Sequence, residues 1–203
     1  MKKRIATLKR KTKETDITVK LNIDGSGKAK INTSIGILDH MLELFAFHGL
    51  FDLEISGKGD LKVDIHHTNE DIGIVLGQAF KEALGTKEGI KRIGFASVPM
   101  EDVVANVTVD ISGRGFFKEI LFPVNPTASI YEKKEYDGFC ANHFFEAFAK
   151  NMGLNLNIQL TSHNFDIHTN LESIFKALGK AMDEATQIDP RRHGIPSTKG
   201  VID

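Results

Sequence analysis

The chain has 203 residues, of which 41% are hydrophobic, and this length and composition fit one globular domain or two small ones. Its net charge at pH 7 is −1, its basic residues are scattered and no apolar run reaches the length of a membrane span, so we expect no nucleic-acid or membrane partner. Cys140 is the only cysteine, which excludes an intramolecular disulfide and a cysteine-based zinc site and makes the cytoplasm the expected compartment.

Four strands and two helices are predicted in the first half of the chain. Apolar residues at alternate positions indicate strands, and apolar residues three or four positions apart indicate helices. Turn residues at 24–27 predict a β-hairpin, and those at 57–60 predict a second strand pair. The predicted elements are strands over 17–23 and 29–31, a helix over 37–47, strands over 53–55 and 61–65, and a helix over 71–84.

The second half repeats this order less completely. Its predicted elements are a strand over 103–111, an exposed loop over 123–134, a helix over 142–151, a strand over 154–160 and a helix over 171–185. Each half is therefore expected to run roughly β-β-α-β-β-α, which predicts a duplicated α+β fold with mainly antiparallel sheets and helices on one face. We expect repeat halves at residues 1–92 and 93–203, packed as one catalytic subunit because no low-complexity linker separates them.

A pattern of histidine and glutamate occurs once in each half. Its members are His40, His66, His67 and Glu70 in the first copy and His143, His168 and Glu172 in the second. The offsets between the copies agree, since 143 − 40 = 103, 168 − 66 = 102 and 172 − 70 = 102. A period of half the chain indicates two copies of one unit. A lone histidine such as His48 or His193 is more often structural, and it is the recurrence that favours metal binding.

The chemistry of this pattern is that of a metal site. If His66 and His67 end a strand, they point to opposite faces and serve two different ions. If the next helix begins near residue 68, Glu70 lies in its first turn and shares an ion with His67. Imidazole with carboxylate suits zinc, manganese, iron or nickel, and ligand softness does not choose among them. Matching loops of a duplicated unit tend to lie apart, so completing a site is expected to require a neighbouring chain.

Several motifs in this order resemble the imidazoleglycerol-phosphate dehydratases of histidine biosynthesis. The motifs lie at residues 38–41, 66–71, 112–114, 143–145, 175–177 and 196–200, and the resemblance runs from Glu14 to Ile202. It implies a duplicated α+β subunit that assembles into a large homo-oligomer, a 24-mer, with two manganese ions in each active site at subunit contacts. The implied reaction is the hydro-lyase conversion of imidazole glycerol phosphate to imidazole acetol phosphate and water.

The resemblance also implies residue roles, which are carried over position by position. The implied metal ligands are His40, His66, His67, Glu70, His143, His168 and Glu172. The implied substrate-binding residues, chiefly for the phosphate, are Glu14, Arg92, Arg114, Lys176, Ser197, Thr198 and Lys199. Two ions on the imidazole nitrogens would stabilise the substrate imidazolate as Lewis acids. Glu14 or Glu172 would move the protons, and the sequence does not say which is the acid and which the base.

The chain departs from the family pattern in the second copy. Thr169 stands where the family has a second histidine, so the affected ion should bind more weakly or take a water ligand. His163 is an alternative ligand nearby. Ile65 replaces an acidic residue that is usual before the first histidine pair, and the approach at 165–167 also differs.

These departures leave more than one function open. We favour a divergent active dehydratase; the alternative is a catalytically impaired metal-binding cage protein of the same family, and a shifted metal preference also remains open. A metal-dependent phosphatase is disfavoured because the chain has no Asp-x-Asp-x-Thr nucleophile loop.

Overall fold

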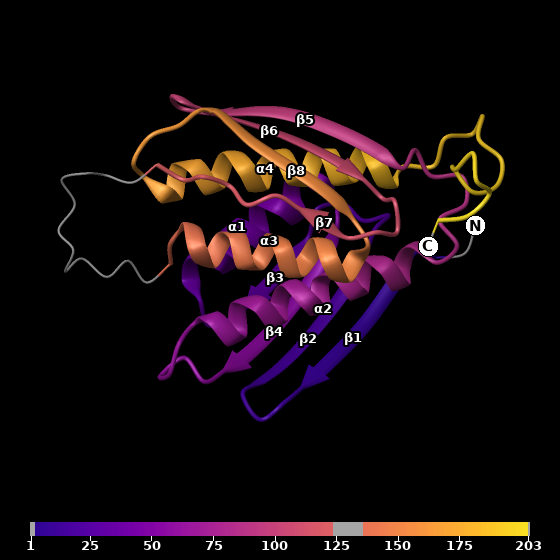
Figure 1. The fold of residues 1–203 in the computed structure, drawn as a ribbon. Helices are drawn as coiled ribbons and strands as arrows, with labels where there is room; N and C mark the ends of the chain where they lie inside the picture. Colours follow the sequence, from indigo (N-terminus) through magenta and orange to yellow (C-terminus); the bar gives the residue numbers. More distant parts are fainter. Residues whose placement is uncertain (1–2, 124–135, 203) are drawn as a thin grey trace.

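The computed structural model describes residues 3–123 and 136–202 (Figure 1). The elements of the first half are β1 (Ile5–Lys11), β2 (Thr15–Asn22), β3 (Ala29–Asn32), α1 (Gly36–Gly49), β4 (Asp52–Gly59) and α2 (His66–Leu84). Those of the second half are β5 (Ile93–Met100), β6 (Val103–Asp110), β7 (Phe116–Phe117), α3 (Gly138–Met152), β8 (Asn155–Ser162) and α4 (Ile167–Thr186). Each half therefore runs β-β-β-α-β-α, and the predicted order β-β-α-β-β-α is wrong in the placement of one strand.

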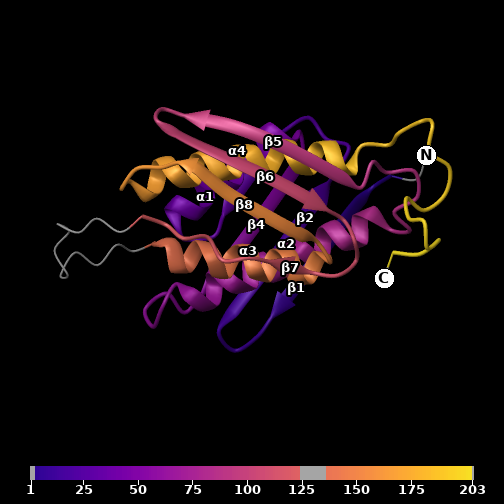
Figure 2. The same cartoon turned by 45° about the horizontal axis from the view of Figure 1, so that its top comes forward.

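Each half forms one four-stranded sheet, and the two sheets have the same topology. The strand orders are β1-β2-β4-β3 and β5-β6-β8-β7, antiparallel except for the parallel pairs β3–β4 and β7–β8. Alternation buries one face of each sheet, as in β2, where Ile17, Val19 and Leu21 are buried. The four helices lie between the two sheets (Figures 1 and 2). The predicted duplicated α+β fold, with helices on one face of each sheet, is confirmed.

The predicted hairpin between residues 17–23 and 29–31 is wrong, because β4 lies between β2 and β3. The turn at 24–27 exists, but the carboxylate of Asp52 accepts hydrogen bonds from the backbone of Ser26 and Lys28. The chain is thereby held against the start of β4, and β3 pairs with β4 in parallel. β2 instead forms a hairpin with β1, a strand that the sequence pattern did not indicate.

The predicted strand over 61–65 is also wrong. This segment is a turn closed by the bond from Val63 N to Asp60 O (2.7 Å), and the Val63 side chain is 74% exposed. Leu61 and Ile65 are partly buried against the core, but they reach it from a turn and not from a strand. Strands β5 and β7 were not predicted.

The predicted helices exist, but three of them begin four or five residues earlier than expected. The Asp137 carboxylate caps α3 through Cys140 N, and the Asp166 carboxylate caps α4 through the backbone of His168 and Thr169. The metal-ligand candidates at 66–70 and 168–172 consequently lie in the first turns of α2 and α4. The predicted loop over 123–134 falls, apart from its first residue, outside the described residues. The division at residue 92 stays a prediction; it falls between α2 and β5.

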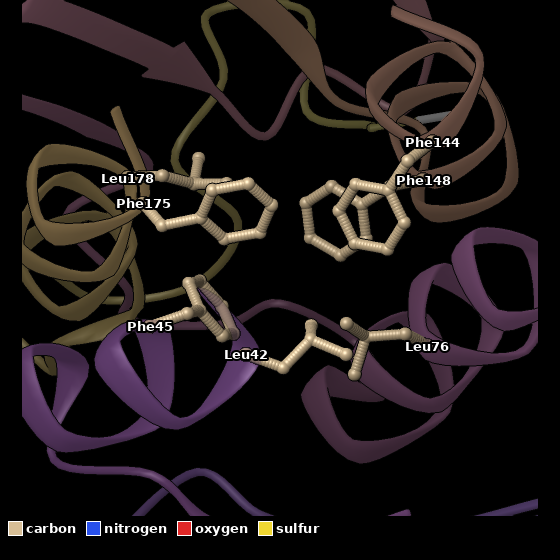
Figure 3. Close-up of a pocket in the computed structure, with 7 residues that line it drawn as sticks. All are labelled: Leu42, Phe45, Leu76, Phe144, Phe148, Phe175 and Leu178. Atoms are coloured by element: carbon tan, nitrogen blue, oxygen red, sulfur yellow. The ribbon is translucent and has the colours of Figure 1, made fainter. Parts of the chain in front are cut away.

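Helices of one half pack against helices of the other, α1 against α4 and α2 against α3. Glycines permit close approach: a Cβ at Gly77 would lie 2.5 Å from Phe148 O, and one at Gly179 would lie 2.6 Å from Phe45 O. Aromatic and leucine side chains of all four helices meet at the centre and leave no room for a water molecule (Figure 3). Within the described part of the chain, no helix is long and apolar enough to cross a membrane.

Candidate metal centre

The first cluster, called the α1–α4 cluster, joins the two halves of the chain and consists of His40, His168, Glu172 and Lys176. His40 Nε2 lies 3.1 Å and His168 Nε2 lies 3.0 Å from the same atom, Glu172 Oε1. The two imidazole rings are stacked, with centroids 5.3 Å apart. Lys176 Nζ donates to Glu172 Oε2 at 2.6 Å. One helix turn separates His168, Glu172 and Lys176 in succession, so α4 presents all three on one face.

Glu172 is ionised in this cluster. Its side chain is only 11% exposed, and burial alone would raise its pKa. Hydrogen bonds from Lys176, His40 and His168 outweigh burial and lower the pKa of Glu172 to about 2. The carboxylate is therefore charged at neutral pH, which is the form that binds a cation.

The second cluster, called the α2–α3 cluster, repeats this arrangement with the halves exchanged and consists of His66, Glu70, His143 and Phe139. His66 Nε2 lies 3.5 Å from Glu70 Oε2, and the His66 and His143 rings are 4.5 Å apart. Phe139 packs against both imidazoles, with ring centroids 5.9 Å from His66 and 4.2 Å from His143. His66 Nδ1 is buried and has no hydrogen-bond partner among residues 3–123 and 136–202.

The grouping differs from the one predicted from sequence. Glu70 was expected to share an ion with His67, on a helix that begins near residue 68. The helix begins at His66, so the i,i+4 relation brings Glu70 to His66 instead. His66 and His67 are also not on opposite faces of a strand, because successive helix residues are rotated by about 100°. The lone histidine of each half joins the His/Glu pair of the other half.

His67 lies outside both clusters and contacts Asp60, at the end of β4. Its Nδ1 is 3.2 Å and 3.3 Å from the two Asp60 carboxylate oxygens. This hydrogen bond raises the pKa of His67 against the opposing effect of desolvation, and the charge of Glu14 adds to the increase. Glu14, in the β1–β2 turn, therefore lies on the His67 side of the molecule.

Thr169 stands in the repeat at the position of the ligand candidate His67, and its hydroxyl has another role. The hydroxyl donates to Asp166 Oδ2 at 2.7 Å, and the Thr169 backbone N donates to the same oxygen at 3.1 Å. Thr169 is thus part of the N-terminal cap of α4. His163 is an exposed side chain and is not in the ligand group formed by His40, His168 and Glu172.

The candidate phosphate residues other than Lys176 lie at the opposite end of the helices. Arg92 N donates to Ala185 O near the end of α4, about 25 Å along the helix from His168. The Arg92 guanidinium binds Asp110 at 2.6 Å and 3.0 Å and reaches Pro196 O at 3.0 Å. The bounds of α4 and the yellow C-terminal segment in Figure 1 show this separation of the two ends.

Two further candidate groups lie at that same end. The Lys199 backbone N donates to Ser197 Oγ at 3.2 Å in the C-terminal segment, which also contains Thr198. Arg114 follows Gly113, whose N donates to Gly153 O at the end of α3. One chain therefore does not bring its candidate phosphate residues to its candidate metal ligands, except for Lys176.

The side chains present fit a divalent metal ion. His40, His168 and Glu172 each offer one ligand atom, and these atoms lie within 4.8 Å of one another. Ligands at about 2.0–2.2 Å from one ion are separated by roughly 3 Å, close to the distances from Glu172 to both histidines. The buried, unpartnered Nδ1 of His66 indicates that the α2–α3 cluster also leaves a ligand atom unused. Imidazole and carboxylate donors suit manganese, iron or zinc.

Sequence patterns missed three residues of these sites. Asp166 stands three residues before Thr169 at a helix start, which is a capping pattern that could have been recognised. Asp60 and Phe139 carried no signal, because their contacts with histidines depend on how a turn and a neighbouring helix approach α2.

Comparison with known sequences identifies relatives along nearly the whole chain. A family model described as imidazoleglycerol-phosphate dehydratase matches residues 33–182. An imidazoleglycerol-phosphate dehydratase of Geobacter metallireducens is 51% identical over 199 residues, which cover 98% of this chain and 99% of that protein. One from a Thermoanaerobacter species is also 51% identical over 199 residues, covering 98% of this chain and 100% of that protein.

Solved structures agree with the sequence relatives. The crystal structure of IGPD from Pyrococcus furiosus matches with a TM-score of 0.79 at 34% identity and covers 96% of this chain and 99% of its own. That of imidazoleglycerol-phosphate dehydratase from Staphylococcus aureus matches with a TM-score of 0.74 at 33% identity and covers 91% of this chain and 99% of its own. This chain therefore belongs to the imidazoleglycerol-phosphate dehydratase family.

Proposed function

We propose that this chain dehydrates imidazole glycerol phosphate to imidazole acetol phosphate and water in histidine biosynthesis, using two manganese ions held by the two histidine clusters. Family membership supports the reaction, a hydro-lyase step of a metal-dependent enzyme family. The observation that carries the proposal is the convergence of His40 and His168 on one oxygen of Glu172, across the two halves of the chain.

The chemistry requires an electron sink, because the proton lost lies on a carbon with no adjacent carbonyl. Bound divalent ions would supply Lewis acidity to the nitrogens of the substrate imidazole. The α1–α4 and α2–α3 clusters would each hold one ion. His67 would contribute a further nitrogen from outside the clusters.

The two candidate catalytic glutamates suit different tasks. Glu172 is buried, and its low pKa makes it a weak base, so it suits metal binding. Glu14 is exposed in the β1–β2 turn, close enough to His67 to influence it electrostatically. We assign proton transfer to Glu14 and metal binding to Glu172.

The separation of metal and phosphate groups supports a site shared between chains. Arg92, Arg114, Ser197, Thr198 and Lys199 of one chain would meet the substrate phosphate at the metal ligands of another. Arginine and lysine suit this role through charge-assisted hydrogen bonds. The protein would then act as a homo-oligomer, for which the family resemblance implies a 24-mer. A cytoplasmic location stays a prediction.

The decisive test is product formation with controlled metal content. Protein stripped by a chelator should form no imidazole acetol phosphate, and addition of Mn²⁺ should restore the reaction. His40→Ala removes the candidate ligand that α1 contributes to the α1–α4 cluster, and it leaves His168 and Glu172 on α4 unchanged. This variant should lower turnover. A manganese-loaded protein that is folded and forms no product would contradict the proposal.

A second candidate function follows from Thr169, whose hydroxyl is bound to Asp166 and adds no imidazole to a metal site. In this alternative the chain forms a metal-binding cage without turnover. Metal-dependent assembly in the absence of product would support it. Thr169→His would then restore activity only if the missing ligand is the sole defect. Thr169→Ser is the matched control because it keeps the hydroxyl that donates to Asp166, the residue whose carboxylate caps α4.

A further inference from the structure

We propose that Asp60 is a positioning residue for His67, fixing which imidazole nitrogen carries the proton and which is free to bind a metal ion. This inference rests on the proposed function, because it concerns how His67 would serve the metal site. Asp60 is not among the residues carried over from the family, and its side-chain hydrogen bonds within residues 3–123 and 136–202 go to His67 and not to a member of either histidine cluster.

The geometry of the contact selects one tautomer. Both Asp60 oxygens lie within hydrogen-bond distance of His67 Nδ1, at 3.2 Å and 3.3 Å. An ionised carboxylate only accepts hydrogen bonds, so Nδ1 must carry the proton. In neutral imidazole the lone pair then lies on Nε2, the nitrogen directed away from Asp60. A carboxylate on the second nitrogen of a ligand histidine is a frequent means of fixing ring orientation and raising ligand basicity.

The two partners are held in place from separate elements. Asp60 directly follows β4, and its carbonyl accepts from Val63 N at 2.7 Å, which closes the turn. The first turn of α2 is anchored by Asn69, a buried residue whose amide donates to Cys140 O at 2.7 Å and accepts from the Tyr136 hydroxyl at 2.9 Å. The contact between Asp60 and His67 therefore joins two restrained segments rather than two mobile side chains.

The second half of the internal repeat lacks both residues of this pair. β8 begins 103 residues after β4 (155 − 52), so His163 stands where Asp60 stands in the first half. Thr169 stands where His67 stands, at the 102-residue offset (169 − 67) of the helix histidines. The second half has neither the histidine nor the carboxylate, and the Thr169 hydroxyl binds Asp166. Where the ligand candidate is absent, a carboxylate at the position of Asp60 is absent too.

A purely structural ion pair is the competing explanation. The side chains of His67 and Asp60 are 36% and 28% exposed, and pairs at such partly exposed positions contribute little to stability. The two explanations differ in their consequence for metal binding. If Asp60 positions His67, removing Asp60 should weaken Mn²⁺ binding only while His67 is present. If Asp60 has a structural role, its removal should weaken Mn²⁺ binding equally with and without His67.

The experiment is a Mn²⁺ titration of the full chain, with free Mn²⁺ followed by electron paramagnetic resonance. Asp60→Ala should weaken Mn²⁺ binding at one class of sites by about 10- to 100-fold. Asp60→Asn, which keeps an acceptor oxygen, should show a smaller loss. His67→Ala should abolish that class, and adding Asp60→Ala to His67→Ala should cause no further change. Glu54→Gln, in an exposed pair with Lys20 on the same sheet, should bind Mn²⁺ as the parent does.

Two results would overturn the inference: unchanged Mn²⁺ affinity in Asp60→Ala, or an equal loss when Asp60→Ala is made in the His67→Ala protein. If Asp60→Ala does not fold, as judged by circular dichroism, the same comparison is made with Asp60→Asn. A parent that binds Mn²⁺ but forms no imidazole acetol phosphate would contradict the proposed reaction, and the coupling between Asp60 and His67 would still be measured.

Discussion

The two histidine clusters have the same origin and different surroundings. In the α1–α4 cluster, the Glu172 side chain is 11% exposed and is hydrogen-bonded to two histidines and Lys176. In the α2–α3 cluster, the Glu70 side chain is 46% exposed and lies 3.5 Å from His66. At the 102-residue offset, Ile74 stands where Lys176 stands. Duplication preserved the helix geometry, while substitutions near it made one site charge-rich and the other open.

Contact with a phenylalanine side chain is found in the α2–α3 cluster and not at the equivalent position of the α1–α4 cluster. Phe139 packs against both imidazoles of the α2–α3 cluster, and at the 103-residue offset Gly36 stands in its place beside the α1–α4 cluster. The α1–α4 cluster therefore combines hydrogen bonds to one buried carboxylate with the stacking of its two imidazoles, whereas the α2–α3 cluster adds contacts with a phenyl ring. We infer that two equivalent ligand sets would bind their ions with unequal strength.

The comparison predicts that the two glutamates respond differently to replacement. Glu172→Gln removes the one charge on which His40, His168 and Lys176 converge, so turnover should fall by more than about 100-fold, beyond the effect typical of residues that only orient a ligand. Glu70→Gln removes the charge of one exposed carboxylate beside His66, and turnover should fall less than in Glu172→Gln. Steady-state rates at saturating Mn²⁺ check both. Equal losses would show that the clusters are functionally alike.

The stability of the metal-free protein at low pH should also depend on Glu172. The folded pKa of Glu172 is about 2, below its ordinary value of 4.5, so its ionised form stabilises the fold above about pH 4.5 and this contribution is lost as pH falls toward 2. Glu172→Gln should therefore lower stability at neutral pH, by at most about 3 kcal/mol, and should change it little near pH 2. Urea unfolding measured from pH 7 to pH 2 tests the difference.

The matched control uses another glutamate–lysine pair one helix turn apart. Glu146 and Lys150 on α3 are 2.7 Å apart, but their side chains are exposed. Glu146→Gln should change stability by no more than about 0.5 kcal/mol. If Glu146→Gln and Glu172→Gln have the same effect at neutral pH, burial does not set the stability contribution of Glu172.

Close packing of α2 on α3 should contribute to the stability of the fold. Gly77→Ala places a methyl group 2.5 Å from Phe148 O and should destabilise the protein by about 1–3 kcal/mol. Gly36→Ala, at the start of α1, is the control because nothing lies within 4 Å of the added atom. Thermal unfolding should show a lowered midpoint only for Gly77→Ala. If Gly77→Ala leaves the unfolding midpoint unchanged, α2 and α3 can move apart to accommodate the methyl group without a loss of stability.

The sequence predicted the members of the clusters better than their grouping. The offsets of 102 and 103 residues identified His40, His168 and Glu172. Nothing in their spacing says that His40 meets the pair from the other half, since that depends on α1 packing against α4. The helix start at His66 was missed because α2 has no side-chain cap, and with it the pairing with Glu70. The order of β3 and β4 was missed because a hairpin pattern was overridden by the contact of Asp52 with residues 26–28.

The smallest expected effect concerns Phe139, whose ring packs against the two imidazoles of the α2–α3 cluster. Phe139 is 58% exposed, so Phe139→Leu should cost only about 0.5–1.5 kcal/mol of ring interaction, and the global fold should not change. Its consequence should instead be local: with the stacking partner removed, His66 and His143 gain freedom, and Mn²⁺ should bind more weakly to one class of sites by less than about tenfold. Phe116→Leu is the control, because Phe116 lies on β7 and is as exposed as Phe139. If Phe139→Leu leaves Mn²⁺ binding unchanged, ring contacts do not orient these imidazoles, and the inequality of the clusters must come from Lys176 and Glu172 alone.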